Sequence, residues 1–212
     1  IHKNFPMAWK PSTGASHFPS HAESSESLIK SADLALYTAK STSRGSLIMF
    51  HPRMRTNNRA REGKIARART ALGEDRIFPF YQPKVELVSG RITGFEALLR
   101  WRQRSGAAQA PEGISPALED FELAPEIGDR MLQLAVSDAR NWLDSGTSFG
   151  GIALNAGAVE LQDKSFADRF LERLREGGVP PHLFQVEVVE TVFLGRGVDR
   201  VEDTLRTLSQ EG

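Results

Sequence analysis

The first third of the chain has few apolar positions, and they are regular in only one stretch. In residues 24–39 they recur at helical spacing, which predicts an amphipathic helix. Gly45 suits the end of that helix, and residues 47–50 form a short apolar run typical of a strand. Residues 54–69 are strongly basic, with sparse apolar side chains and no aromatic ones. We therefore expect a solvated linker helix there in preference to a nucleic-acid-binding arm.

From residue 77 onward the pattern alternates between strands and helices. Residues 77–82 and 91–101 are predicted strands, and a Ser89-Gly90 turn joins them into a hairpin. Further predicted elements follow: a helix over 127–143, a strand over 151–155, a helix over 166–174, a strand over 184–189 and a helix starting over 201–208. This alternation implies parallel strand–helix–strand units with right-handed crossovers, and hence an α/β fold.

Composition and charge narrow the classes of function. The chain has 212 residues, 40% of them hydrophobic and 25% charged, which is typical of a soluble globular protein. Lys and Arg number 27, as do Asp and Glu, so there is no global basic field and we expect no direct binding of DNA or RNA. The absence of cysteine excludes disulfides and thiolate metal sites. No apolar run approaches the roughly 20 residues of a membrane span. We expect a cytoplasmic location for the protein.

Three predicted strands carry a hard oxygen donor near the carboxyl end: Glu96 in GFEALLRW, Asn155 in GIALNAG and Glu187 in FQVEVVET. In a parallel barrel, residues at these strand ends converge on one face, where ligands bind. Two carboxylates and an amide oxygen suit Mg²⁺ or Mn²⁺ better than zinc. Arg100 lies four residues beyond Glu96 and so on the same face, where a guanidinium suits a phosphate.

The same residues also allow structural roles. Glu96 and Arg100 could form an internal ion pair that offsets the cost of burying both charges. Asn155 could satisfy a turn, and a lone Glu in a strand is more often an edge charge than a metal ligand. The spacing alone leaves both interpretations open.

Longer motifs around these residues resemble a known family. FYQPKVELVSGRITGFEALLRW resembles the opening hairpin of EAL-domain phosphodiesterases, IALNAGAVEL their Asn-bearing strand, and QVEVVETVFL their second Glu-bearing strand. The order and intervals agree over about residues 74–212. The resemblance implies an EAL-type TIM-like (β/α)8 barrel that hydrolyses cyclic di-GMP to linear pGpG. Because such a barrel needs about 250 residues, we expect these residues to be about its first half, within a longer protein.

The resemblance also implies a metal centre. Glu96, Asn155 and Glu187 would be ligands, and a complete site would hold two Mg²⁺ or Mn²⁺ ions that polarise the phosphate and activate a bridging water. Further along, the family carries an Asp pair in a DDFG motif, then a Lys, a Glu and a Gln. These groups do not follow TLRTLSQEG within the 212 residues. By the family pattern, the chain alone does not complete a two-metal site.

Other positions match the family's substrate site. Arg100 would contact a phosphate of the dinucleotide, Leu98 would line the substrate floor, and Gln82 would lie near the pocket. Glu190 resembles the second Glu of the family's ExxE pair, which positions a mobile loop over the site, and we count it with Glu96 as catalytic.

Two departures from the family pattern bear on this site. The segment 115–121 is several residues shorter than in the family, where it helps to hold a guanine, so we expect weaker binding. Val189 stands where the loop motif usually has Thr, so we expect reduced loop order and no loss of metal.

The N-terminal part resembles a second domain. ADLALYTAKSTSRG resembles the last helix of GGDEF domains, and STGASHFP the strand before it. We therefore expect the C-terminal part of an α+β GGDEF-like domain over 1–53, a basic linker helix over 54–73 and the first half of an EAL domain over 74–212. The GGDEF signature loop is missing, so no cyclase activity is predicted. The family resemblance further implies a homodimer through the EAL domains, and a sensory region elsewhere in a longer protein could anchor it to a membrane.

Three functions compete at this point. The leading hypothesis is a cyclic di-GMP phosphodiesterase in bacterial second-messenger signalling. The alternative is a catalytically inactive cyclic di-GMP receptor or regulatory scaffold, and the third is an unrelated α/β protein. Degenerate EAL domains commonly lose the Glu of the EAL triplet or another ligand. Retention of Glu96, Asn155 and Glu187 therefore favours the enzyme.

Overall fold

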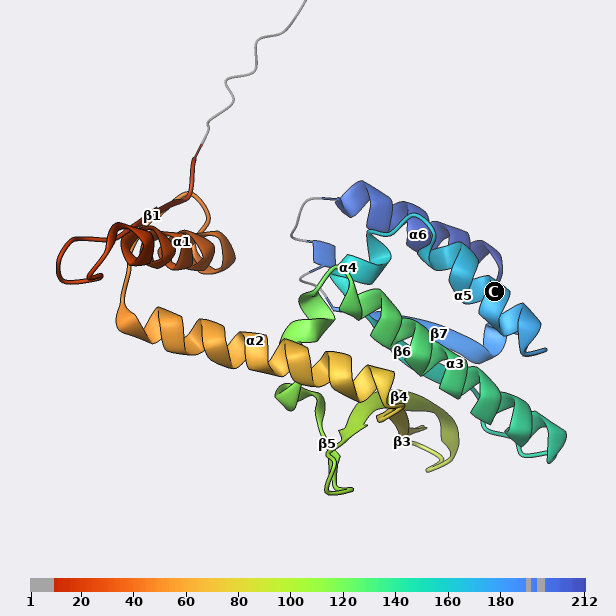
Figure 1. The fold of residues 1–212 in the computed structure, drawn as a ribbon. Helices are drawn as coiled ribbons and strands as arrows, with labels where there is room; N and C mark the ends of the chain where they lie inside the picture. The colour runs from red at the N-terminus through yellow and green to blue at the C-terminus, as the bar shows by residue number, and fades with distance from the viewer. Residues whose placement is uncertain (1–9, 190–191, 194–196) are drawn as a thin grey trace, which may run out of the picture. The chain divides into compact units, whose positions relative to one another are not determined.

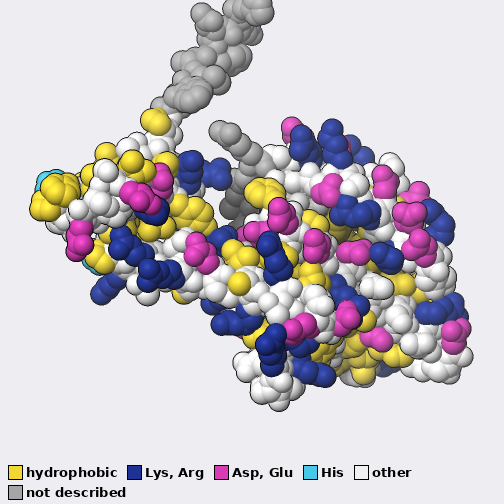
Figure 2. All heavy atoms as spheres, viewed as in Figure 1, with side chains coloured by type: hydrophobic (Ala, Val, Ile, Leu, Met, Phe, Trp, Pro, Cys, Tyr) yellow, Lys and Arg dark blue, Asp and Glu magenta, His cyan; other side chains and the backbone are white. Residues whose placement is uncertain are grey.

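The computed structural model describes residues 10–189, 192–193 and 197–212 (Figure 1). The chain divides into two compact units, Ile1–Gly63 and Lys64–Gly212. Figure 2 shows acidic and basic side chains interspersed over the face of the second unit that is in view. In the described part of the chain, no helix is long and apolar enough to cross a membrane.

The first unit is a helix packed on a pair of short parallel strands. Strand β1 (Thr13–Ala15) pairs with β2 (Leu47–Met49), and α1 (Ser25–Thr42) lies against them. Gly14 allows this close approach, because a Cβ there would lie 2.1 Å from the backbone nitrogen of Leu36. The predicted helix and strand are confirmed within a few residues.

Helix α2 (Pro52–Gly73) runs from the first unit into the second. One of its arginines forms a hydrogen bond inside the first unit, and another forms one inside the second. In the first unit, Arg55 donates to the Ser31 hydroxyl at 3.1 Å. In the second unit, Arg67 donates to the Gly113 carbonyl at 2.8 Å. Ala68 and Ala71 are fully buried, so the expectation of a solvated helix is wrong over its last turns.

The second unit is built on one sheet whose path runs β3, β4, β6, β7. The strands are β3 (Ile77–Val85), β4 (Ile92–Arg102), β6 (Ile152–Ala156) and β7 (Phe184–Val188), and the short β5 (Ala108–Gln109) pairs with β4. β3 and β4 are antiparallel, whereas β4, β6 and β7 are mutually parallel. The predicted hairpin and parallel strands are therefore confirmed.

Helices connect the parallel strands, as the alternation predicted. They are α3 (Leu123–Asp144), α4 (Ala158–Leu161), α5 (Phe166–Glu176) and, after β7, α6 (Val198–Gln210). Short 3-10 segments in the described residues are η1 (Pro111–Gly113), η2 (Ser115–Glu119) and η3 (Pro181–Leu183). Helix α3 begins four residues before the predicted start.

Strand alternation separates a core face from an open face. Ala97 and Trp101 of β4 and Leu154 of β6 are buried in one core with α3 and α5. Residues 96, 98, 100 and 155 point to the other face because side chains alternate along a strand. Gly150 sets the start of β6. Its φ is +73°, and a Cβ there would lie 2.1 Å from the Thr93 carbonyl oxygen.

Candidate functional site

The three predicted metal ligands lie on neighbouring parallel strands and on the open face of the sheet. The Asn155 amide nitrogen donates to Glu96 Oε1 at 2.7 Å. Asn155 also stands in register with Glu187 on β7, so their side chains are neighbours on one face. Glu96 and Glu187 are half-buried, and Asn155 is exposed. The fold thus brings two carboxylates and an amide together at the strand ends.

The residues expected to bind substrate share this face. Gln82 stands directly opposite Glu96 in the hairpin register, and Leu98 follows two residues later on β4. The Arg100 guanidinium donates to the Leu99 carbonyl at 2.8 Å and lies 5.6 Å from the centre of the Phe80 ring. Within the described ranges, no ion pair joins Arg100 to Glu96. The structural alternative of an internal Glu96–Arg100 pair is therefore wrong.

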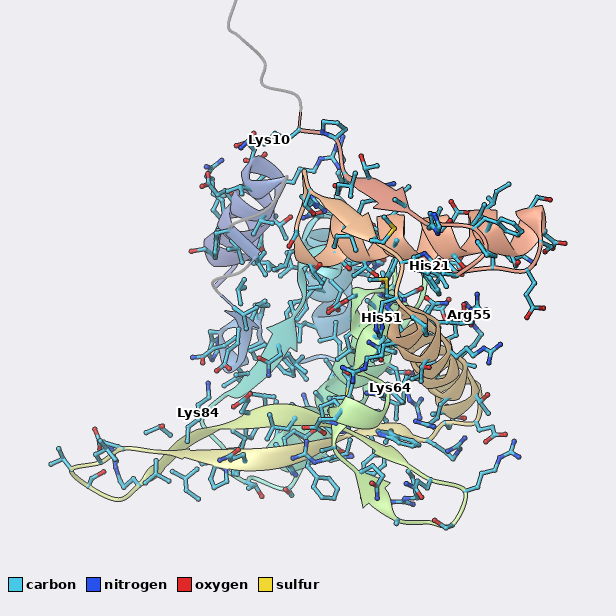
Figure 3. The ribbon with its side chains drawn as sticks, turned by 90° about the vertical axis from the view of Figure 1, so that its left-hand side faces the viewer. Lys10, His21, His51, Arg55, Lys64 and Lys84 are labelled. Atoms are coloured by element: carbon cyan, nitrogen blue, oxygen red, sulfur yellow. The ribbon has the colours of Figure 1, made fainter. Side chains whose placement is uncertain are left out.

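A lysine that the sequence interpretation did not single out also reaches this face. The Lys84 ammonium lies 2.5 Å from Glu187 Oε1 and 3.4 Å from the Gln185 side-chain oxygen. Figure 3 shows its side chain rising from the hairpin. Lys84 follows Gln82 by two residues, so strand alternation predicts that both side chains lie on the same face of the sheet. The sequence gives no indication that the partner of Lys84 is Glu187, because that contact depends on how the sheet curves.

Glu96, Asn155 and Glu187 are suitable as some of the ligands of a hard divalent cation. Carboxylate and amide oxygens are the ligands that Mg²⁺ prefers, and it usually keeps waters and substrate phosphates as the others. The amide of Asn155 needs only a flip about its last torsion to turn its oxygen toward a cation. No group of three or more His, Cys, Asp or Glu side chains in the described ranges could hold a metal ion. Glu96 and Glu187 therefore need the amide oxygen of Asn155 and further ligands.

A cavity of about 330 Å³, within the size range of ligand pockets, lies where β4 and β6 meet α3 and α5, and the core-face residues Ala97 and Leu154 line it. Leu98, Arg100 and Asn155 contribute to its wall, and the rest is mostly apolar. Leu118 of η2 also lines it. The short segment 115–121 thus forms part of this wall, and its Phe121 side chain is 81% exposed.

A second unpredicted residue, Glu160 of α4, lies mostly buried beside the cavity. Its Oε2 accepts a hydrogen bond from the Gly157 backbone nitrogen at 3.0 Å, and a Cβ on Gly128 would lie 1.9 Å from its Oε1. Burial raises the pKa of Glu160 to about 7, although the Gly157 N–H and the charge of Arg169 act in the opposite direction. Glu160 therefore braces the turn that follows Asn155. The sequence signal was a Glu at the third position of a helix.

Glu190 lies outside the described residues. The neighbouring Val189 is 58% exposed at the end of β7.

Comparison with known proteins decides the family. The EAL domain family matches residues 65–212. The chain belongs to the EAL domain family. Its similarity to solved EAL-domain structures indicates a TIM-barrel-like fold for this part. A solved structure described as PaMucR phosphodiesterase in complex with c-di-GMP is 30% identical, with a TM-score of 0.64, and the match covers 70% of this chain and 60% of that one.

Curated EAL-family relatives are longer than this chain. MucR of Pseudomonas aeruginosa, a bifunctional diguanylate cyclase and cyclic di-GMP phosphodiesterase, is 29% identical over 95% of this chain and 29% of its own. The cyclic di-GMP phosphodiesterase PdeR of Escherichia coli is 30% identical over 86% of this chain and 27% of its own. The chain spans about a quarter of the length of the curated relatives it matches. The EAL match begins at residue 65, so the GGDEF-like origin of the preceding residues stays a prediction.

Proposed function

We propose that the protein hydrolyses cyclic di-GMP to linear pGpG in a reaction that depends on Mg²⁺ or Mn²⁺. The observation that carries this proposal is the grouping of Glu96, Asn155 and Glu187 on three neighbouring parallel strands of an EAL domain. The names of MucR and PdeR support the substrate.

The metal ligands in this proposal are Glu96, Asn155 and Glu187. Bound divalent ions would polarise the phosphate and activate a water for in-line attack. A complete two-ion site needs more oxygen ligands than these three side chains supply. The activity is therefore proposed for the whole protein, with these residues as one part of its site.

We propose that Arg100 orients the phosphate. Its guanidinium bonds to a backbone carbonyl and to no carboxylate of the described residues, so its charge is available to an anionic ligand. Strand alternation places Arg100 on the same face of β4 as Glu96 and Leu98. We propose that Leu98 forms the floor, that Gln82 lies beside the ligand, and that Glu190 positions the loop after β7.

One observation favours the alternative, a receptor that binds cyclic di-GMP without cleaving it. The predicted ligand Glu187 is already neutralised by Lys84. The Lys84 charge offsets the charge of one of the two carboxylates, which lowers the repulsion that an anionic dinucleotide would meet without a metal.

Domain boundaries, assembly and location are also proposals. We propose a GGDEF-like remnant over 1–53, a linker helix over 54–73, a homodimer through the EAL domains and a cytoplasmic site of action.

The test is turnover of cyclic di-GMP by the full-length protein with Mg²⁺ or Mn²⁺, beside Glu96→Ala. We expect Glu96→Ala to lose turnover while it still binds the dinucleotide. The matched control is Glu172→Ala, on the exposed face of α5, which should keep wild-type turnover. Wild-type binding without metal-dependent turnover would instead support the receptor.

A further inference from the structure

The Lys84 side chain connects the two outer strands of the path β3-β4-β6-β7 on the open face of the sheet. It lies on β3, whereas its partner Glu187 lies on β7, and β4 and β6 stand between them in the sheet. Its ammonium still reaches Glu187 Oε1 at 2.5 Å and Gln185 at 3.4 Å. Both members of the ion pair are about one-third exposed (35% and 37%), so the contact is open to solvent ions.

We propose that Lys84 is a tethered cation that competes with a divalent metal ion for Glu187 and so sets the metal affinity of the site. The inference rests on the proposed function, because it takes Glu187 as a metal ligand.

Charge and geometry support this competition. Mg²⁺ binds carboxylate oxygens at about 2.0–2.1 Å, so an ammonium on the same carboxylate would lie close to the ion and repel it. Lysine has a flexible four-carbon stem and can swing away, which makes the exchange reversible. Glu96 differs because its partner is the neutral amide of Asn155. Among the residues that the structure describes, Lys84 is paired with Glu187 and no cation is paired with Glu96, so a metal ion would have to displace a cation at Glu187 alone.

A purely structural role for the pair is the competing explanation. A partly exposed ion pair contributes little to stability, so stability alone cannot separate the two roles. Metal affinity can separate the two roles, because loss of a purely structural ion pair should not make the metal bind more tightly.

The first experiment is Mn²⁺ titration of the full-length protein, followed by the electron paramagnetic resonance signal of free Mn²⁺. We expect Lys84→Met to bind Mn²⁺ about two- to fivefold more tightly, which is the range an ion pair of this exposure supports. Lys84→Arg should stay near wild type because it keeps the charge. The control Lys30→Met breaks a lysine–glutamate pair of 2.6 Å on α1 and should change nothing. Unchanged or weaker binding in Lys84→Met would overturn the proposal.

Two further measurements complete the test. In the Glu187→Gln background, Lys84→Met should no longer tighten Mn²⁺ binding. In the wild-type protein, which avoids any folding defect of a variant, the Lys84 ¹³Cε resonance should move during a Mg²⁺ titration with the midpoint of metal binding. A Lys84 resonance that stays fixed while the metal binds would refute the competition.

Turnover measured in parallel separates this proposal from the proposed function. Metal-dependent turnover without tighter binding in Lys84→Met would overturn the role of Lys84 alone. No Mn²⁺ binding to any of the proteins would overturn both.

Discussion

Replacing Glu160 by Gln tests the buried carboxyl that braces the turn after Asn155. The side chains have nearly the same shape, and a Gln oxygen can still accept the hydrogen bond from the Gly157 nitrogen. The substitution therefore removes the titration and keeps the contact. Arg169 also faces Glu160, but it forms an ion pair with Asp163 at 2.6 Å, so part of its charge is already neutralised.

The pKa of Glu160 fixes the sign and size of the effect. Burial raises the pKa from its ordinary value of 4.5 to about 7, so between these values the folded state holds a proton that the unfolded state has released. Stability therefore falls as the pH rises through this interval, and the loss is complete above the folded pKa. At about 1.36 kcal/mol per pH unit, the loss amounts to about 3 kcal/mol. The Glu160→Gln variant should not lose this stability, because its side chain does not ionise.

Urea unfolding at a series of pH values measures this difference. We expect Glu160→Gln to match the wild type near pH 4.5 and to be more stable by about 3 kcal/mol at pH 8. The control Glu172→Gln, on the exposed face of α5, should show no such trend. Equal stability of Glu160→Gln and wild type at pH 8 would show that the carboxyl is hydrated and would refute the reasoning.

Two other predictions concern the hairpin that carries the site. Tyr81→Phe removes the 2.7 Å hydrogen bond to Asp138 and should lower the free energy of unfolding by about 1–2 kcal/mol in urea. Burial and Asp138 raise the pKa of Tyr81, so its hydroxyl stays protonated and remains a hydrogen-bond donor. The loss of unfolding free energy should therefore be the same at pH 6 and pH 9. A loss at only one of these pH values would contradict this reasoning. Arg100→Ala should weaken cyclic di-GMP binding, measured by calorimetry, more than it weakens Mn²⁺ binding. Unchanged dinucleotide affinity would show that Arg100 is structural.

The sequence predicted the elements that rest on local periodicity. The hairpin and the parallel strands appear where the apolar pattern placed them, because alternation and helical spacing report which faces are buried. The shared face of Glu96, Leu98 and Arg100 followed from the same rule.

Contacts that depend on how the sheet curves were beyond sequence reasoning. Lys84 and Glu187 are 103 residues apart, and nothing local in either strand indicates that one reaches the other. Glu160 was missed for a related reason. Its surroundings come from Gly128 on α3, an element that the local pattern near residue 160 does not reveal.

The most direct test of the proposed metal-dependent hydrolysis is the product formed from cyclic di-GMP by the full-length protein. The nucleotides are separated by chromatography after incubation with Mn²⁺, and again after EDTA has removed the metal. We predict that linear pGpG accumulates with Mn²⁺, that EDTA stops it and that restored Mn²⁺ revives it. Cyclic di-GMP that is bound but remains intact in the presence of Mn²⁺ would contradict the account.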